Sequence, residues 1–296
     1  MSEIKEKKIL VTGAEGMLGS DLMARLRQEM DVRIFPATIH DLDVADLVAV
    51  RDRVLDVMPD IVIHCAAYTA VDQAEEDQHH AYLVNAGGTK NLAIFCREID
   101  AEMYYISTDF VFDGAKGSPY LESDDPSPIN TYGATKLAGE RFVAALVPRH
   151  KICRTSWLCG HQGRNFIETI LKLASRQNVI SVINDQIGSP TFTVDLADRI
   201  VRLLGVGESG IYHITNSGYC SWYEFAGRII EQAGLEGVRL RPITSEEFRS
   251  MARRPKYSVL DNSRLRELGI EQAPRWEDGV DRYLGARDQP DDIVVY

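Results

Sequence analysis

The chain has 296 residues, 45% of them hydrophobic, and a formal net charge of −11 at pH 7. This length can bury a sizeable core, either as one large domain or as a large domain with a small one. The acidic balance argues against a nucleic-acid partner, because phosphate binding needs extended clusters of Lys and Arg.

The first residues of the chain and its cysteines indicate the cellular compartment. The polar segment MSEIKEKK leads straight into an apolar run, so no signal peptide is expected, and no apolar run reaches the ~18 residues of a membrane span. Five scattered cysteines, none in CxxC spacing, indicate reduced thiols and suggest neither a disulfide framework nor a metal site. We therefore expect a cytoplasmic protein without a membrane partner.

In the first half of the chain, short apolar runs alternate with longer segments of helical period. Strands are predicted at residues 8–13, 32–37, 60–67, 102–108 and 151–156, and helices at residues 17–30, 44–58, 81–99 and 132–147. Unbroken β-branched runs are typical of parallel strands that helices cover on both faces. Residues 1–157 are therefore predicted to form mainly a Rossmann-like, doubly wound α/β domain that binds a nicotinamide cofactor.

Beyond residue 157 the alternation continues with longer links that contain Pro and Gly. Further elements are predicted at residues 164–177, 178–185, 193–205, 210–216, 221–234 and 276–284. We interpret residues 158–296 as mainly a smaller, intercalated substrate-binding lobe. The acidic tail GARDQPDDIVVY is expected to be loosely held.

The first chemical motif is VTGAEGMLG, which places Gly13, Gly16 and Gly19 between the first strand and the first helix. Such glycines allow a tight turn and a close approach of the backbone to a pyrophosphate, whose charge the helix N-terminus favours. A plain strand-to-helix turn is the alternative.

The second strand ends in FPATIH, without an acidic residue that could grip a ribose 2′-hydroxyl. NADP is therefore permitted, since nothing there repels a 2′-phosphate. Asp43 and Val44 could frame the adenine, although Asp43 could equally be a helix N-cap.

The segment STDFVFDG puts Thr108 and Asp109 at the carboxyl end of a buried strand. Downstream, Tyr132 and Lys136 lie four residues apart, so on a helix they share one face. An ammonium beside a phenol lowers the pKa of the phenol toward the range of an acid/base catalyst. An exposed Tyr and Lys pair is the alternative, but the hydroxyls of Thr108 and Tyr132 can both address one carbonyl oxygen.

These motifs resemble the extended short-chain dehydrogenase/reductase superfamily. Within it, the chain is similar to the dTDP-4-dehydrorhamnose reductases in the segments CAAYTAVDQAEED, STDFVFDG, YGATKLAGE, RTSWLCG, NDQIGSPT and RPKYSVLDN. The resemblance implies NAD(P)H-dependent reduction of the C4 ketone of dTDP-4-dehydro-L-rhamnose to dTDP-L-rhamnose, a precursor of cell-surface polysaccharide. A dTDP-sugar substrate is therefore expected, and a homodimer is possible.

The resemblance also implies roles for individual residues. The catalytic group would be Thr108, Tyr132 and Lys136. The cofactor would be bound by Gly13, Gly16, Met17, Leu18, Asp43, Val44, Ala67, Tyr68, Thr69, Tyr132 and Lys136. The substrate would contact Thr108, Asp109, Trp157 and Arg254.

Two positions depart from the family pattern: Tyr68 replaces a usual His, and Phe110 replaces a usual Tyr. Both keep an aromatic ring, so packing should survive, while any polar contact of the usual side chain is in doubt. Related nucleotide-sugar 4,6-dehydratases carry TDE at this strand end, where the Glu abstracts a proton. Because Phe110 cannot take a proton, ketone reduction is favoured over elimination. Asp109 either orients a substrate hydroxyl or caps the following turn.

Three candidate parts of the substrate site have simpler alternatives. Trp157 matches a position that lies against the sugar in this family, or it is a core residue at the lobe boundary. The segment NDQIGSPT would form a wall of the sugar cleft, or a structural loop. Arg254, beside Arg253 and Lys256, is the candidate clamp for the diphosphate, or part of a solvated basic turn.

The rival functions are a C4 reductase that makes another 6-deoxyhexose, such as the talose epimer, and a regulatory protein that binds NADP without catalysis. Loss of Tyr132 or Lys136 would favour the regulatory protein, and both are present. We expect NADPH as cofactor with NADH also accepted, no structural metal, and leave a role for Mg²⁺ open.

Overall fold

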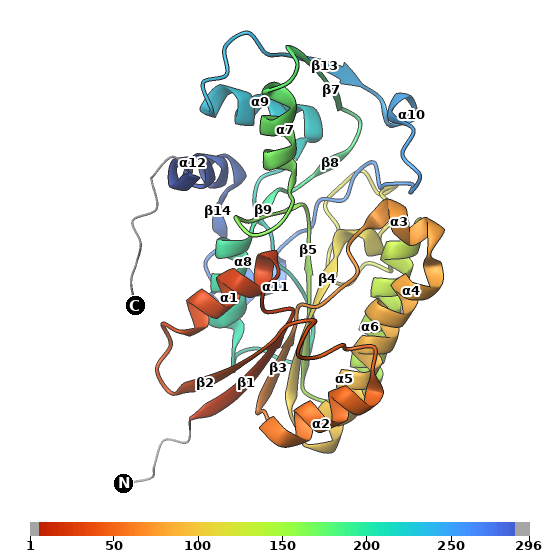
Figure 1. Cartoon of the computed structure of the whole chain (residues 1–296), viewed down its shortest axis with the longest axis vertical. Helices are drawn as coiled ribbons and strands as arrows, with labels where there is room; N and C mark the ends of the chain where they lie inside the picture. Colours follow the sequence, from red (N-terminus) through yellow and green to blue (C-terminus); the bar gives the residue numbers. More distant parts are fainter. Residues whose placement is uncertain (1–5, 288–296) are drawn as a thin grey trace.

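The computed structural model describes residues 6–287, and its centre is a six-stranded parallel sheet (Figure 1). The strands are β1 (Lys7–Thr12), β2 (Val32–Ala37), β3 (Ile61–His64), β4 (Glu102–Thr108), β5 (His150–Thr155) and β10 (Gly210–His213). Their order across the sheet is β10-β5-β4-β3-β1-β2, and every pair is parallel. This confirms the predicted doubly wound fold, and the order reverses at β1, between β3 and β2.

Helices cover both faces of this sheet, as the fully buried strands require. One face packs against α1 (Met17–Leu26) and α8 (Thr193–Leu203) in a core that includes Leu22 and Ile200. The other packs against α2 (Leu47–Val57), α5 (Thr89–Glu98) and α6 (Thr131–Leu146). Figure 1 shows the two helical layers on opposite sides of the strands.

The helix predicted at residues 81–99 is longer and less regular than expected. It runs through α4 (Gln78–Tyr82), a π-helical turn at Leu83–Gly88 and α5, and a further short helix, α3 (Val71–Glu76), precedes it. π-helical turns often occur at functional sites. Here the turn carries Asn85, a buried residue whose contacts are described below.

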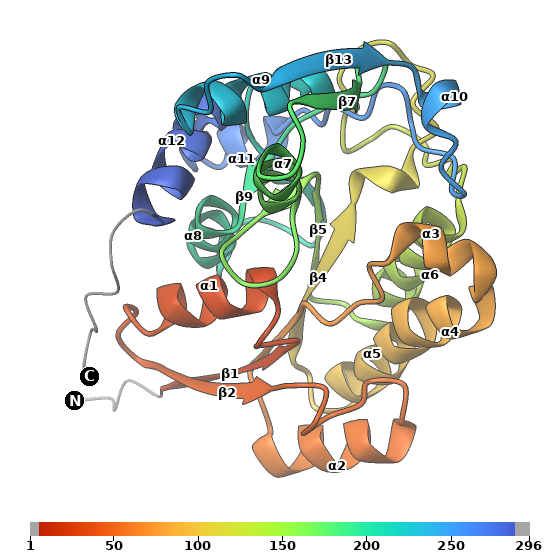
Figure 2. The same ribbon diagram turned by 45° about the horizontal axis from the view of Figure 1, so that its top comes forward.

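The second lobe lies beyond the carboxyl end of the sheet, as Figure 2 shows. It contains β7 (Val179–Ile183) paired with β13 (Arg239–Ile243), and the helices α7 (Phe166–Ala174), α9 (Trp222–Gln232), α10 (Ser245–Phe248) and α12 (Trp276–Arg287). Its short strands are β6 (Leu158–Cys159), β8 (Ile187–Gly188), β9 (Thr191–Phe192), β11 (Asn216–Ser217), β12 (Cys220–Ser221) and β14 (Ala273–Arg275). A separate apolar core, which includes Phe225 and Val280, holds this lobe together.

Three segments beyond residue 157 belong to the first lobe, where they join the central sheet or one of its helical faces. β10 pairs with β5 as the edge strand, α8 packs along α1, and α11 (Ser263–Glu267) adds Leu265 to the same core. The tail expected to be loosely held lies outside the described residues from residue 288 onward. Among residues 6–287, none of the helices combines the length and apolar character that a membrane crossing requires.

Candidate active site

The polar residues predicted to form the site lie at one edge of the sheet. Because β1, β3, β4 and β5 are parallel, the segments that follow them all leave the sheet at the carboxyl edge. In open sheets of this type, ligands bind at this edge, at the point where the strand order reverses. That point is here the turn after β1.

The turn after β1 is built for close backbone contact. Gly13 has a φ of +66°, and a Cβ there would lie 2.7 Å from the backbone N of Ala66. Gly16 begins α1 without any side-chain cap. Met17 and Leu18 are the first residues of α1. No side chain therefore occupies the positive end of the helix dipole, where their N–H groups lie. A phosphate group fits this arrangement.

Asp43 and Val44 lie between β2 and α2. Asp43 is exposed, and its carboxylate accepts a hydrogen bond from the N–H of Ala45 at 2.9 Å. The N-cap of α2 is Asp46, which accepts from the N–H groups of Val48 and Ala49. The alternative that Asp43 caps the helix is therefore wrong.

Arg53 was not among the predicted residues, yet the fold brings it to the end of β2. Its Nη2 donates to the carbonyl of Pro36 at 3.0 Å, and its Nε is buried without a hydrogen-bond partner among the described residues. The sequence analysis of this cofactor region considered only the residues of the second strand and those just after it. Arg53 escaped it because the residue belongs to α2, and only the packing of α2 beside β2 brings it there.

The loop after β3 contains Ala67, Tyr68 and Thr69. The N–H of Tyr68 donates to Oδ1 of Asn85 at 2.8 Å, and Nδ2 of Asn85 donates to the Tyr68 carbonyl at 3.1 Å. The Tyr68 ring meets the His80 ring edge-on, with 5.3 Å between centroids. Asn85, which the sequence did not single out, thus holds the loop through its backbone, independently of the Tyr side chain.

Thr108 and Asp109 leave β4 as a buried, hydrogen-bonded pair. The Thr108 hydroxyl donates to Oδ1 of Asp109 at 3.0 Å, and the Ser258 hydroxyl donates to Oδ2 at 2.6 Å. Thr108 also accepts from the N–H of Phe110 and so caps the short 3₁₀ turn itself. Burial raises the pKa of Asp109 to about 7, against the opposing effect of the two hydroxyls.

Tyr132 approaches this pair from the first turn of α6. The helix is capped by Asn130, whose carboxamide oxygen accepts from the N–H of Gly133 at 2.7 Å. Gly133 lies against the carbonyl of Phe110, where a Cβ has no room. The Phe110 and Tyr132 rings then meet edge-on, with 5.9 Å between centroids.

Lys136 was expected to lower the pKa of Tyr132, and the structure shows the opposite direction. The pKa of Tyr132 is raised, by burial and then by the charge of Asp109, and only the hydroxyl of Thr108 acts in the other direction. Lys136 is itself buried, with Nζ 4.1 Å from the centroid of the Tyr105 ring, and burial lowers its pKa to about 7. A raised pKa keeps the proton on Tyr132 at neutral pH, which suits a proton donor.

Trp157 follows β5 with a φ of +46° and lies partly buried at the lobe boundary. One face of its indole stacks on Trp222, with 3.4 Å between ring centroids and an angle of 5°. The segment NDQIGSPT packs against this pair, because Gly188 leaves room for Trp157 and Gln186 accepts from the indole of Trp222 at 3.2 Å. Trp157 therefore has both a packing role and an aromatic surface near the strand ends.

Arg254 lies in the second lobe and is paired with Asp72 of α3. Its two guanidinium nitrogens donate to the carboxylate at 3.1 and 2.8 Å, and the N–H of Ala252 donates to the same group at 2.9 Å. Arg254 is thus a partly buried link between the lobes rather than part of a solvated basic turn. Arg253 and Lys256 beside it are exposed.

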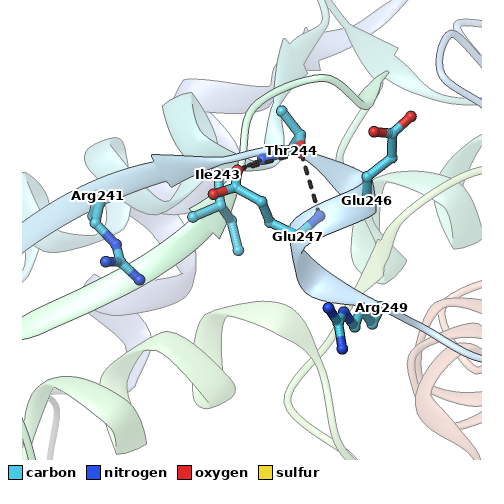
Figure 3. A pocket seen from close by; sticks show the side chains of 6 residues that line it. All are labelled: Arg241, Ile243, Thr244, Glu246, Glu247 and Arg249. Carbon is cyan, nitrogen blue, oxygen red and sulfur yellow. Dashed lines mark hydrogen bonds between the residues drawn. The ribbon is translucent and has the colours of Figure 1, made fainter.

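A groove on the described surface lies away from these residues. It has a volume of about 680 Å³ and runs over β13 and α10 (Figure 3). Its lining comprises Arg241, Ile243, Thr244, Glu246, Glu247 and Arg249. None of the predicted site residues lines it. Within residues 6–287, no group of three or more His, Cys, Asp or Glu side chains could hold a metal ion.

A parallel sheet with a glycine turn after its first strand, and a Tyr and Lys one helical turn apart facing the end of β4, characterise the extended short-chain dehydrogenases/reductases. The chain belongs, within that class, to the RmlD substrate binding domain family, whose sequence model matches residues 7–288.

Individual relatives and solved structures are consistent with this family. The chain is similar to a dTDP-4-dehydrorhamnose reductase from Bacillus anthracis, crystallised in complex with NADP, with a TM-score of 0.91, 42% identity, and coverage of 95% of this chain and 99% of that one. It is 40% identical to a dTDP-4-dehydrorhamnose reductase of Streptomyces griseus, over 93% of this chain and 92% of the relative. It is 42% identical to a dTDP-4-keto-6-deoxy-D-glucose reductase of Streptomyces niveus, over 90% and 93%.

Proposed function

We propose that the protein is an NADPH-dependent reductase of the C4 ketone of dTDP-4-dehydro-L-rhamnose, which yields dTDP-L-rhamnose. The observation that carries this proposal is the meeting of Thr108 and Tyr132, two hydroxyl groups from β4 and α6, at the carboxyl edge of the sheet. The relatives named above support the choice of a dTDP-sugar and of NADPH.

The cofactor would be held by the turn at Gly13 and Gly16 and by the backbone at Met17 and Leu18. When bound, NADPH supplies the hydride. Asp43, Val44 and the loop Ala67–Thr69 would line its path toward Tyr132 and Lys136. We infer from this path that the first lobe binds the cofactor and the second the sugar.

The residues of this chain supply the proton and the polarisation. Tyr132 donates its proton to the developing C4 oxygen. The Thr108 hydroxyl, which in the structure donates to Asp109, would rotate to donate its hydrogen bond to the same oxygen. Because burial and Asp109 keep Tyr132 protonated, the donor is ready at neutral pH. Lys136 would bind the cofactor ribose. General acids and hydroxyl donors of this kind each contribute on the order of a hundredfold in rate or more.

Phe110 distinguishes this reaction from elimination. Its ring packs against Tyr132, at the position where a dehydratase needs a proton-abstracting carboxylate. A side chain without a basic atom cannot remove a sugar proton, so the site supports reduction alone.

The second candidate function is reduction of a different dTDP-4-keto sugar. The similarity to a dTDP-4-keto-6-deoxy-D-glucose reductase, at 42% identity, favours keeping it. The chemistry of Thr108 and Tyr132 would be the same, with the hydride delivered to another sugar or another face.

The decisive experiment supplies the purified protein with dTDP-4-dehydro-L-rhamnose and either NADPH or NADH. We expect cofactor oxidation with both and a preference for NADPH, and dTDP-L-rhamnose by NMR. A product with the opposite configuration at C4 would establish the second candidate. Absence of cofactor oxidation both with this sugar and with dTDP-4-keto-6-deoxy-D-glucose, in a preparation that still binds NADPH, would refute a reductase role.

A further inference from the structure

A buried ion pair lies one helical turn below Lys136. Glu140 accepts two hydrogen bonds from the guanidinium of Arg154, at 2.9 and 2.7 Å, and a third from the hydroxyl of Ser107 at 2.5 Å. The side chains of Glu140 and Arg154 are only 5% and 1% exposed. The cluster joins α6, β4 and β5 directly behind the candidate active site.

Stability alone does not account for such a pair. Removing two charges from water costs about as much as their attraction returns, so a buried ion pair of this kind is a weak source of stability. Its place in the fold is more informative. Glu140 follows Lys136 by four residues on α6, and residues at this spacing lie on the same face of a helix.

We propose that Glu140 is a positioning residue for the reaction, which holds Lys136 in its ammonium form beneath Tyr132 while Arg154 and Ser107 fix the carboxylate in place. The proposal rests on the proposed reductase function, in which Lys136 binds the cofactor ribose. Glu140 touches neither substrate nor cofactor and acts only through Lys136.

The orientation of the pair supports this role. The charge of Glu140 raises the pKa of Lys136, whereas the charge of Arg154 lowers the pKa of His213 on β10. The guanidinium carbon also lies 5.0 Å from the centroid of the Phe112 ring. The pair therefore presents its negative end to Lys136 and its positive end to β10, and adds no net charge to the core.

The neighbouring titratable groups of β3 and β4 carry no negative charge at neutral pH that would raise the pKa of Lys136 as Glu140 does. Cys65 at the end of β3 also acts on Lys136, but burial raises the pKa of this thiol to about 12, so it is uncharged at neutral pH. Burial likewise keeps Tyr105 of β4 protonated and lowers the pKa of His64 of β3 to about 3. Burial lowers the pKa of Lys136, the charge of Glu140 opposes this shift, and the resulting pKa is about 7. Glu140 is thus the carboxylate that favours the ammonium form.

The test measures the pKa of Lys136 directly in the full-length protein. Lysines are labelled with ¹³C at Cε, the Lys136 signal is assigned with Lys136→Met, and its titration is followed by NMR in wild type and in Glu140→Gln. We expect the pKa to fall by about 1, because an opposite charge at this range typically shifts a pKa by about 1 to 3. The basic limb of the pH profile of kcat should move down by a similar amount.

A matched control is available on the same strands. Glu102 of β4 binds Lys151 of β5 in a second buried ion pair, with 2.7 Å between Oε1 and Nζ, at the opposite end of the sheet. Glu102→Gln removes the same charge from a similar pair, and should leave both the Lys136 titration and the kcat profile where they are in wild type.

Variants of the two partners should shift the pKa of Lys136 in opposite directions, which separates the electrostatic effect from damage to packing. Arg154→Met should raise the pKa of Lys136, because it leaves the carboxylate uncompensated. If Glu140→Gln fails to fold, Arg154→Met is compared with the double variant Arg154→Met/Glu140→Gln, and the pKa should be lower in the double variant. Glu140→Asp keeps the charge and should stay closer to wild type than Glu140→Gln.

An unchanged pKa of Lys136 in Glu140→Gln, with only a lower melting temperature, would overturn the proposal and leave a packing role. The titration needs no turnover. If wild type reduces no dTDP-sugar, the reductase function fails, while the titration still decides whether Glu140 sets the charge of Lys136.

Discussion

Replacing Asp109 by Asn should make the protein less sensitive to rising pH. Asp109 has a pKa of about 7 in the folded protein, against 3.8 for an unperturbed Asp, because it is buried. A raised pKa means that its contribution to stability is complete below pH 3.8 and is lost as the pH rises through 7. At about 1.4 kcal/mol per pH unit, wild type should lose about 2 kcal/mol relative to Asp109→Asn between pH 5 and pH 7.

The assay is urea unfolding of both proteins at several values between pH 5 and pH 8. Asn can still bond to the hydroxyls of Thr108 and Ser258, so the pH-dependent part of the difference isolates the carboxylate. His64 and His213, whose pKa values burial lowers to about 3, titrate alike in both proteins and cancel.

Asp113→Asn is the control for this measurement. The N–H of Ala115 and the hydroxyl of Tyr120 lower the pKa of Asp113, so its substitution should give a difference that is flat over the same range. If the free energy of unfolding of wild type, measured relative to that of Asp109→Asn, stays constant or increases from pH 5 to pH 7, the reasoning is refuted.

Three further predictions concern catalysis and binding. Tyr132→Phe should lose most turnover, on the order of a hundredfold or more, yet bind NADPH normally by fluorescence, and near-normal turnover would contradict its role as proton donor. Arg254→Ala should raise the KM for the dTDP-sugar several-fold without changing that for NADPH, whereas Asp72→Asn should lower it by freeing Arg254, and equal effects on both ligands would argue against a diphosphate clamp. Arg53→Ala should raise the KM for NADPH and spare NADH, while Arg51→Ala, an exposed neighbour on α2, should change neither.

The sequence predicted the elements whose pattern is local and strong. The buried strands of the first half and α6 were placed to within a few residues, because continuous β-branched runs and helical period are dictated by burial. β3 ends at His64, earlier than predicted, since the chain leaves the sheet there to form the loop that Asn85 holds.

Weakly patterned elements escaped prediction. β13 is largely exposed and contains Pro242, so it has neither the apolar alternation nor the composition of a typical strand. The strand at β10 was predicted, but its partner was not. Nothing local in GIYH indicates that it pairs with β5 and completes the sheet of the other lobe.

The same limit applies to the site. The spacing of Tyr132 and Lys136 is a local property of a helix and could be read from the sequence. The contacts that connect the site to the second lobe join residues far apart: Arg254 binds Asp72 across 182 positions, and Ser258 binds Asp109 across 149. Both contacts come from one short segment, which lies across the loops after β3 and β4. Local rules specify which side chains follow the strand ends. Only the tertiary fold specifies that this segment binds Asp72 of α3 through Arg254 and Asp109 after β4 through Ser258.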